Sequence, residues 1–332
     1  MQTGIIDKSK IKTGIKIFLI LTVISLLVIL LFTGSKDTLK AFKHIVIPYF
    51  FLTLFIACVF AYFNAIRIIY IARTMGKNLS ILDSLYFALG GNLLGTITPF
   101  QSGGAPFQLY LLTKRSFSVA ESTALIVIRG ILPALIVPFA LPFVAIRYAS
   151  FFHSGAVKTI LFYLLILYIT ILVVFLIIFF VPAKFEKFLI GIIKKESWRI
   201  KIPKIFNSLE DFKHIIFNFF RRGGKNALIA VILTYVSLAA NFLLAPAILY
   251  TIGLKTSLID ATIVQFILTY IIAFTPTPGA SGAAELAGAA LFSTICPKAY
   301  IPVYIVYWRF FSNYLFSIIG AFFLIDFIRK DI

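Results

Sequence analysis

The sequence has 332 residues, of which 61% are hydrophobic, and its mean hydropathy is +1.03. These values are far above those of ordinary soluble domains, and several apolar runs are long enough to cross a bilayer. They exclude a water-soluble globular protein. The sequence predicts an all-α polytopic membrane protein, with residues 1–332 forming a single integral membrane domain.

The formal net charge of +19 comes from 31 Lys and Arg residues against 12 Asp and Glu residues. Nucleic-acid-binding proteins share such an excess, but positive loops also orient membrane proteins and contact anionic lipid. In so apolar a chain we expect anionic inner-leaflet lipid as the partner, and no nucleic acid. Cys58 and Cys296 are too few and too far apart for a disulfide framework or a zinc site, and no metal or cofactor is predicted.

Taken in chain order, the apolar stretches predict six full spans and two interrupted segments. The N-terminal run has no small-residue cleavage site after it, so we interpret it as a retained span. The third span carries Pro133, Pro138 and Pro142, which predict kinks. The predicted spans are residues 15–32, 45–65, 122–146, 157–181, 227–250 and 302–327, and the interrupted segments are residues 81–112 and 258–295.

The two interrupted segments carry the same motif. Thr-Pro-x-x-Ser-Gly occurs at residues 98–103 and again at residues 277–282. Each copy follows a Ser-x-x-Asp sequence, at residues 80–83 and 257–260, and each precedes an intramembrane arginine, Arg129 or Arg309. These features predict an internal repeat over residues 80–130 and 257–310.

Proline and glycine in both motifs predict re-entrant helices that break inside the membrane, because irregular backbone survives there only against protein or a wet cavity. Such paired, interrupted segments are typical of transporter binding sites. The residues expected at the two tips are Thr98, Pro99, Gly103 and Gly104 in the first segment and Thr277, Pro278, Gly279 and Gly282 in the second.

The placement of Lys and Arg predicts the orientation. Eleven of them fall in the connection at residues 182–226, which we place in the cytoplasm as a basic, amphipathic segment on the inner leaflet. We therefore expect a protein of the cell membrane with both termini in the cytoplasm. Because three spans separate the interrupted segments, the repeat should be inverted, with its tips meeting near the bilayer midplane and Ser102 close to Ser281.

Arg129 and Arg309 are the first candidate binding residues. An arginine inside a span costs about 2.5–3.5 kcal/mol on insertion scales and normally faces the protein interior with a partner. One interpretation is recognition of a lipid phosphate by the guanidinium groups. The alternative is a structural pair with helix carbonyls or with a carboxylate.

Glu285 is the only carboxylate near either tip, and the first copy has Pro106 at the aligned position. Glu285 could carry a proton, bind a cationic head group or pair with Arg309. It could also be a first-turn glutamate that the helix dipole favours. Ser-x-x-Asp at Asp83 and Asp260, like Ser-x-x-Glu at Glu121, predicts helix caps.

The remaining polar residues of the interrupted segments fall into two groups. Gln101, Ser102 and Gln108 at the first tip, and Ser281 at the second, are candidates to line a polar pocket. We interpret Asn92, Asn241 and Gln265 as interhelical hydrogen-bond residues. Neither a phosphate-binding Gly-rich loop nor a hydrolase or metalloprotease motif occurs, so an enzyme is not the favoured class.

At its two motifs the sequence resembles the membrane region of lysylphosphatidylglycerol synthases and related flippase-like membrane proteins. The resemblance is carried by TPFQSGGAPFQLYLL (residues 98–112), TPTPGASGAAE (275–285) and YWRFFSNY (307–314), and it covers about residues 10–330. It implies a multi-span fold with re-entrant segments and a role in moving or handling phospholipid. Many members have a glutamate after a glycine of the first motif, whereas here Gly104 is followed by Ala105.

Full-length synthases also carry a soluble domain that uses aminoacyl-tRNA, and we expect it to be absent from this chain. We therefore expect a translocase that moves anionic or aminoacylated phospholipid between the two tips, with the arginines holding the phosphate. One alternative is an intramembrane lipid-modifying enzyme, to which the family name phosphatidylglycerol lysyltransferase would apply. Another is a scaffold for a separate lipid-modifying enzyme.

The predicted orientation can be tested by cysteine labelling. In a background that lacks Cys58 and Cys296, single cysteines at Ser197 and Ser154 should react with an impermeant maleimide from opposite sides of the membrane. Labelling of both positions from one side would contradict the orientation.

Overall fold

The computed structural model describes residues 35–147, 196–273 and 275–331 continuously, with scattered helical residues between 16 and 31 and between 162 and 173. The described residues form α-helices joined by short 3-10 and π-helical turns, with no strand among them. In chain order the elements are α2 (Lys36–Lys43), α3 (Ile47–Thr74), α4 (Ile81–Leu85), η1 (Tyr86–Gly90), α5 (Gly91–Thr96), η2 (Pro99–Gln101), α6 (Gly104–Lys114), α7 (Val119–Ala134), α8 (Val137–Arg147), α11 (Glu196–Arg222), α12 (Gly224–Thr251), α13 (Leu258–Ile272), η3 (Pro278–Ala280), α14 (Ala283–Phe292), η4 (Lys298–Tyr300), α15 (Ile301–Arg309), η5 (Phe310–Tyr314) and α16 (Leu315–Asp331).

Four described helical stretches are long and apolar enough to cross a membrane. They are Ile47–Thr74, Val119–Val144, Gly224–Thr251 and Lys298–Phe327, which correspond to the predicted second, third, fifth and sixth spans. The predicted spans at residues 15–32 and 157–181 lie largely outside the described residues. The all-α membrane class is confirmed, and the number of spans stays a prediction.

The second predicted span ends too early. The predicted span ends at residue 65 and so excludes Arg67, whereas α3 continues to Thr74. Arg67 lies inside the helix, only 7% exposed, and its Nη1 donates to Thr234 Oγ1 on α12 at 3.4 Å. A partner of this kind lets an arginine remain within an apolar helix, so the charge does not mark the helix end.

The described helices group into two compact units. The first comprises Met1–Ile69, Ser80–Leu111 and Ile232–Ile332, and it holds both interrupted segments. The second comprises Tyr70–Leu79 and Leu112–Val231, and it holds α7, α8 and α11. Both sequence motifs therefore belong to one unit.

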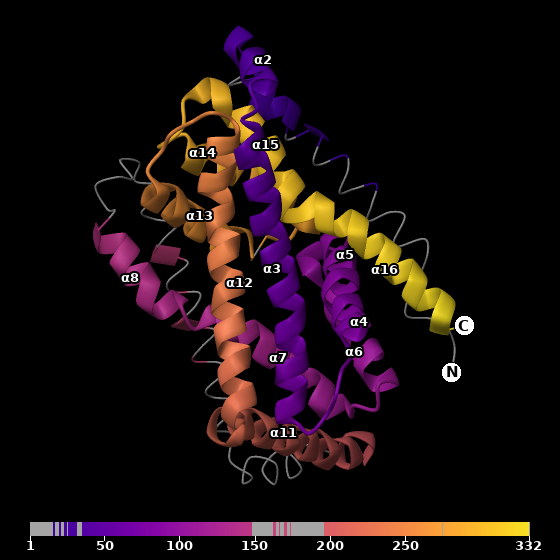
Figure 1. Ribbon diagram of the computed structural model, residues 1–332. Helices are drawn as coiled ribbons and strands as arrows, with labels where there is room; N and C mark the ends of the chain where they lie inside the picture. The colour runs from indigo at the N-terminus through magenta and orange to yellow at the C-terminus, as the bar shows by residue number, and fades with distance from the viewer. Residues whose placement is uncertain are drawn as a thin grey trace. The chain divides into compact units, whose positions relative to one another are not determined.

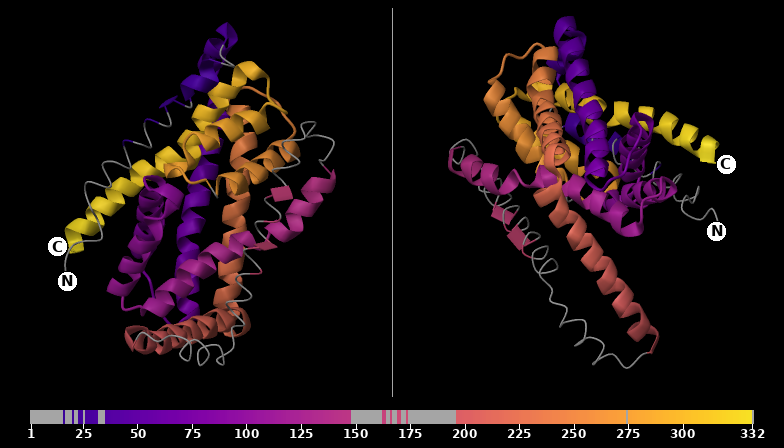
Figure 2. Two further views of the ribbon diagram at one scale, coloured as in Figure 1. Left: turned by 180° about the vertical axis from the view of Figure 1, so that it is seen from behind. Right: turned by 60° about the horizontal axis from the view of Figure 1, so that its bottom comes forward.

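Both interrupted segments of the first unit are broken helices, as the motifs predict. In the first, α4, η1 and α5 run continuously to Thr96 and α6 begins at Gly104; in the second, α13 ends at Ile272 and α14 begins at Ala283. At 1.5 Å per residue the four arms are about 15 to 24 Å long, shorter than the roughly 30 Å of hydrocarbon. Figures 1 and 2 show α13 and α14 near the α2 end of α3, and α4 to α6 toward its other end.

The long C-terminal helix packs against both broken segments. Its first part, α15, contacts α14, where the rings of Tyr304 and Phe292 lie 4.0 Å apart. Its last part, α16, contacts η1 and α5, and Tyr86 donates a hydrogen bond to the Asp326 carboxylate there. At Gly320 a Cβ atom would lie 2.4 Å from the Leu89 carbonyl oxygen, so only glycine permits this approach.

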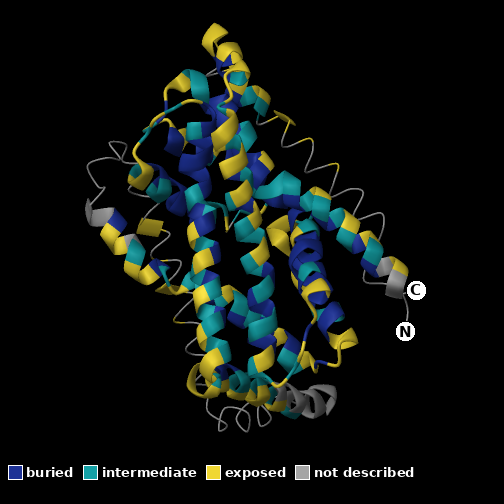
Figure 3. Ribbon diagram, viewed as in Figure 1, coloured by how far each residue is buried: buried dark blue, intermediate teal, exposed yellow. Residues whose placement is uncertain are grey.

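Side-chain hydroxyls join α3 to α12 in the first unit. Thr53 and Thr251 are hydrogen-bonded at 2.9 Å, and Ser237 Oγ donates to the Phe60 carbonyl at 3.1 Å. Both helices bury one side and expose apolar residues on the other, whereas η1 and α5 are mostly buried (Figure 3). This pattern fits helices that present one face to lipid and one to protein.

In the second unit, proline divides the predicted third span. The helix α7 ends at Ala134, next to Pro133, and α8 begins at Val137, so the span is interrupted near the first of the three prolines, while Pro138 and Pro142 lie within α8. Ser118 and Glu121 form the predicted capping box at the start of α7. The helix α11 covers part of the predicted basic connection, while residues 182–195 lie outside the described residues.

A glycine substitution tests the packing of the first broken segment. A Cβ atom at Gly104 would lie 2.7 Å from the Gly91 carbonyl oxygen, whereas one at Gly130 would meet nothing within 4 Å. Gly104→Ala should therefore lower the free energy of unfolding by about 1–3 kcal/mol, the usual cost of overpacking. Gly130→Ala should lower the thermal midpoint of the purified protein much less, and equal effects would contradict the packing.

Candidate functional site between the two helix breaks

The first four residues of the two motif copies, 98–101 and 277–280, adopt the same local backbone conformation. Each Thr-Pro pair opens a 3-10 turn, and the next residue is left-handed: Phe100 has φ 52° and ψ 20°, and Gly279 has φ 58° and ψ 20°. The following residues, Gln101 and Ala280, both have a φ of 55°. The same two hydrogen bonds close each turn, one to the threonine carbonyl and one to the proline carbonyl. The copies diverge at the next residue, which is helical at Ser102 (ψ −22°) and extended at Ser281 (ψ 142°), so the likeness in backbone geometry is confined to the turn.

The two tips are in contact within the first unit. The turns η2 and η3 pack together, and the Phe100 N–H donates to the Pro276 carbonyl at 3.3 Å. This contact joins segments more than 170 residues apart in the sequence. It satisfies one backbone donor of the first tip, which a helix break would otherwise leave without a partner in a nonaqueous environment.

A buried ion pair holds the second tip. Arg309 Nε donates to Glu285 Oε1 at 2.7 Å, and the two side chains are 2% and 0% exposed. Arg309 Nη1 also donates to the Gly279 carbonyl at 3.0 Å, and Glu285 Oε2 accepts from the Gly282 N–H at 2.7 Å. Two of the interpretations of Glu285 are therefore correct together: it pairs with Arg309 and it caps the first turn of α14.

The first tip has a hydroxyl where the second has this carboxylate. The Gly103 N–H, aligned with that of Gly282, donates to Thr98 Oγ1 at 2.8 Å. Thr98 in turn donates to the Leu94 carbonyl at 2.7 Å. Pro106 is tolerated in place of an aligned glutamate because the Thr98 hydroxyl already satisfies the glycine N–H.

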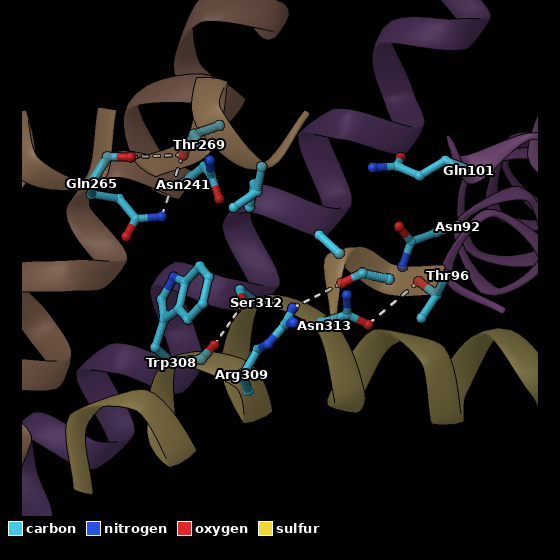
Figure 4. Close-up of a pocket in the computed structure, with 13 residues that line it drawn as sticks. Asn92, Thr96, Gln101, Asn241, Gln265, Thr269, Trp308, Arg309, Ser312 and Asn313 are labelled. Atoms are coloured by element: carbon cyan, nitrogen blue, oxygen red, sulfur yellow. Dashed lines mark hydrogen bonds between the residues drawn. The ribbon is translucent and has the colours of Figure 1, made fainter. Parts of the chain in front are cut away.

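A polar cavity of about 150 Å³ lies in the first unit, beside both tips (Figure 4). A single water needs only about 10–15 Å³, so the cavity is roughly tenfold larger than that minimum. Figure 4 shows Gln265 and Asn241 on one side of it, Asn92 and Gln101 on the other, and Arg309 between them. The lining residues are Asn92, Thr96, Gln101, Asn241, Gln265, Thr269, Ile272, Gly279, Ala280, Trp308, Arg309, Ser312 and Asn313.

Arg309 is the charged side chain of this cavity. No carboxylate among the described residues lines it. While Nε and Nη1 are hydrogen-bonded within the tip, the buried Nη2 has no hydrogen-bond partner among the described residues. A buried donor without a partner costs about 1–3 kcal/mol, more when charged, and here it marks a place where an anionic ligand would be stabilised.

The structure brings together some of the predicted site residues and not others. Gln101 and Arg309 line the cavity, and so does the tip residue Gly279. Gln108 and Ser281 are buried away from it, and Gln108 donates to the Phe87 carbonyl at 3.2 Å. Ser102 is exposed and does not line the cavity either.

Arg129 lies on α7 in the second unit and is half-buried. It does not line the cavity. Its expected role in holding phosphate stays a prediction.

Several lining residues were not identified as such from the sequence. Asn92, Asn241 and Gln265, which we interpreted as interhelical hydrogen-bond residues, all face this cavity. Trp308, Ser312 and Asn313 are on the last helix, two of them in the π-helical turn η5 that begins directly after Arg309. Such π turns are frequent at functional sites. The available signal was the cluster of polar residues around Arg309 within YWRFFSNY.

Comparisons with known proteins agree with this membrane fold. The family model described as "Lysylphosphatidylglycerol synthase TM region" matches residues 17–320. A protein from Archaeoglobus fulgidus, described as a "UPF0104 membrane protein", is 26% identical over 267 residues, which cover 77% of this chain and 80% of the relative. No solved structure matches the chain.

The buried pair predicts a measurable loss of stability. Glu285→Gln leaves Arg309 as an uncompensated buried charge, so the free energy of unfolding should fall by about 3–5 kcal/mol. The matched control is Asp37→Asn, which breaks the exposed Asp37–Lys40 pair and should leave the thermal midpoint nearly unchanged because solvent already screens that pair. A Glu285→Gln midpoint equal to that of the control would contradict the role of the pair.

Proposed function

The chain belongs to the family of the lysylphosphatidylglycerol synthase transmembrane region, and from this premise we propose that it translocates anionic phospholipid across the cell membrane. The family links the protein to phospholipid handling. The finer proposal, that the head group passes between the two helix breaks, rests on the geometry of the first unit. In this proposal the cavity receives the lipid head group, and Arg309 contacts its phosphate.

The observation that carries the proposal is the free Nη2 of Arg309. A guanidinium group has five N–H donors in a planar fork that matches phosphate oxygens. At Arg309 the Nε and Nη1 donors are used by Glu285 and Gly279, so the group is already oriented before a ligand arrives. A phosphate oxygen in the cavity would accept from Nη2 without displacing either partner.

The broken helices support translocation in preference to simple binding. Short arms that end at mid-segment, with polar residues gathered at the ends, are the usual construction of transporter sites. A head group needs such a polar path because the hydrocarbon core does not solvate it. The inverted orientation of the two segments relative to the membrane remains part of this proposal, as does the cytoplasmic location of both termini.

A double-mutant cycle separates recognition from structure. Arg309→Gln and Glu285→Gln should each lower the thermal midpoint, and the double variant should recover much of the loss because no unpaired charge stays buried. Translocation should not recover in the double variant, since Nη2 is gone. The assay follows head-group-labelled phosphatidylglycerol in liposomes, with an impermeant quencher that reports the outer leaflet.

The control for this cycle is Arg67→Gln, which removes another buried arginine of the first unit that does not line the cavity. It should lower stability but leave translocation per folded molecule unchanged. Wild-type translocation by the Glu285→Gln, Arg309→Gln double variant would remove Arg309 from the proposed path.

A further inference from the structure

The chemistry of the cavity lining is unusual for a site that has to receive a charged lipid. Apart from Arg309, its polar side chains are neutral, and most of them are carboxamides or hydroxyls. The carboxamides come from both broken segments, from α12 and from η5, so they surround the space. They are Asn92, Gln101, Asn241, Gln265 and Asn313. A carboxamide both donates and accepts, which is what a hydroxyl-bearing ligand requires.

Three buried atoms on these lining side chains have no hydrogen-bond partner among the described residues. They are the donors Arg309 Nη2 and Trp308 Nε1 and the acceptor Gln265 Oε1. Arg309, Trp308 and Gln265 are each no more than 2% exposed. Native structures pair the great majority of such groups with protein or ordered water, so a ligand that displaces water from this cavity is favoured where it supplies these three partners. That ligand has to present acceptors to the two donors and a donor to Gln265.

A phosphate linked to a hydroxyl-bearing group meets this requirement. Its phosphate oxygens accept from Nη2 and Nε1, and its hydroxyls donate to Gln265 Oε1 and exchange hydrogen bonds with the other carboxamides. An amine-terminated head group meets it poorly. Its ammonium is only a donor, and no lining carboxylate among the described residues is present to accept from it.

Glu285 does not change this conclusion. Its Oε1 accepts from Arg309 and its Oε2 from the Gly282 N–H, and the side chain is fully buried without lining the cavity.

We propose that the cavity selects phosphate head groups that carry neutral hydroxyls, such as glycerol or a sugar, over head groups that end in an amine. The inference rests on the proposed function only in taking this cavity as the head-group site.

The two tryptophans of the chain make a direct binding assay possible. They are Trp198 and Trp308, so Trp198→Phe leaves Trp308, a cavity residue, as the only indole. Three probes with identical dihexanoyl chains are titrated into this variant in detergent: phosphatidylglycerol, phosphatidylmethanol and phosphatidylethanolamine. The first two carry the same charge and differ in hydroxyls, and the third carries an amine.

The expected result is a saturable change in Trp308 emission with each probe, in that order of affinity. Loss of one good hydrogen bond weakens binding about tenfold. The dissociation constant should therefore rise about tenfold from phosphatidylglycerol to phosphatidylmethanol, and about tenfold again to phosphatidylethanolamine. Equal affinity for phosphatidylglycerol and phosphatidylmethanol would overturn the recognition of hydroxyls. Equal or tighter binding of phosphatidylethanolamine, or no saturable response to any probe, would overturn the selection against amines.

Substitutions at Gln265 test the same inference from the protein side. Gln265→Glu places a carboxylate in the cavity and should shift the preference toward phosphatidylethanolamine. Gln265→Leu removes the free acceptor and should reduce the preference for phosphatidylglycerol over phosphatidylmethanol. The matched control is Gln108→Leu, a buried glutamine of the first unit that does not line the cavity, and it should keep the wild-type order. An unchanged order in both Gln265 variants would contradict the inference.

The proposed translocation and the proposed head-group selectivity can be refuted independently of one another. Selective binding of phosphatidylglycerol by a protein that moves no lipid in liposomes would refute translocation and leave the selectivity of the cavity intact. Translocation of all head groups at one rate, with equal binding of the three probes, would refute the selectivity and leave translocation intact.

Discussion

The buried pair between Arg309 and Glu285 is the interaction on which the second helix break depends. The left-handed turn at Gly279 and the positive φ of Gly282 leave backbone groups that no helix can satisfy. Arg309 donates a hydrogen bond to the Gly279 carbonyl, and Glu285 accepts one from the Gly282 N–H. Each charge alone would be expensive to bury, but together they neutralise one another and fasten the tip to the C-terminal helix. The Arg309–Glu285 pair therefore both stabilises the helix break and orients the guanidinium group.

The two copies of the repeat contribute chemically different groups to the site. They share the backbone of the turn, but the first tip is closed by the uncharged hydroxyl of Thr98, so the positive charge comes from the second copy alone. The first copy contributes Asn92, Thr96 and Gln101 to the other side of the cavity. A charge on one side and neutral amides on the other suit an elongated head group whose phosphate and hydroxyls differ in chemistry.

Much of this fold could be predicted from the sequence, because its signals are local. Apolar length predicts the spans, Ser-x-x-Asp predicts the caps that Ser80 and Ser257 form, and the Thr-Pro motif predicts both breaks. The end of α3 was missed because hydropathy treats Arg67 as a boundary, whereas a partner on α12 keeps it within the helix. Long-range pairing of this kind has no signal in a local window.

The candidate site was only partly predictable for the same reason. Arg309 and Gln101 stand out by charge and by position, but Gln265 and Asn241 look alike whether they join helices or line a cavity. Which of them faces the cavity depends on how the two breaks meet and on the π turn after Arg309, and both are tertiary features. The alternatives for Glu285 likewise needed the geometry, since the sequence cannot show that one carboxylate serves both Arg309 and Gly282.

The central claim, that a phospholipid head group enters the cavity between the breaks, is tested most directly by photocrosslinking in cells. A photoreactive amino acid replaces Gln101 at the exposed edge of the cavity, and a second variant carries it at Phe322, an apolar residue of α16 that is 70% exposed. The adducts are identified by mass spectrometry. We predict phospholipid crosslinked through its head group at Gln101 and through its acyl chains at Phe322. Acyl-chain adducts at both positions, or no lipid adduct at Gln101, would contradict the account.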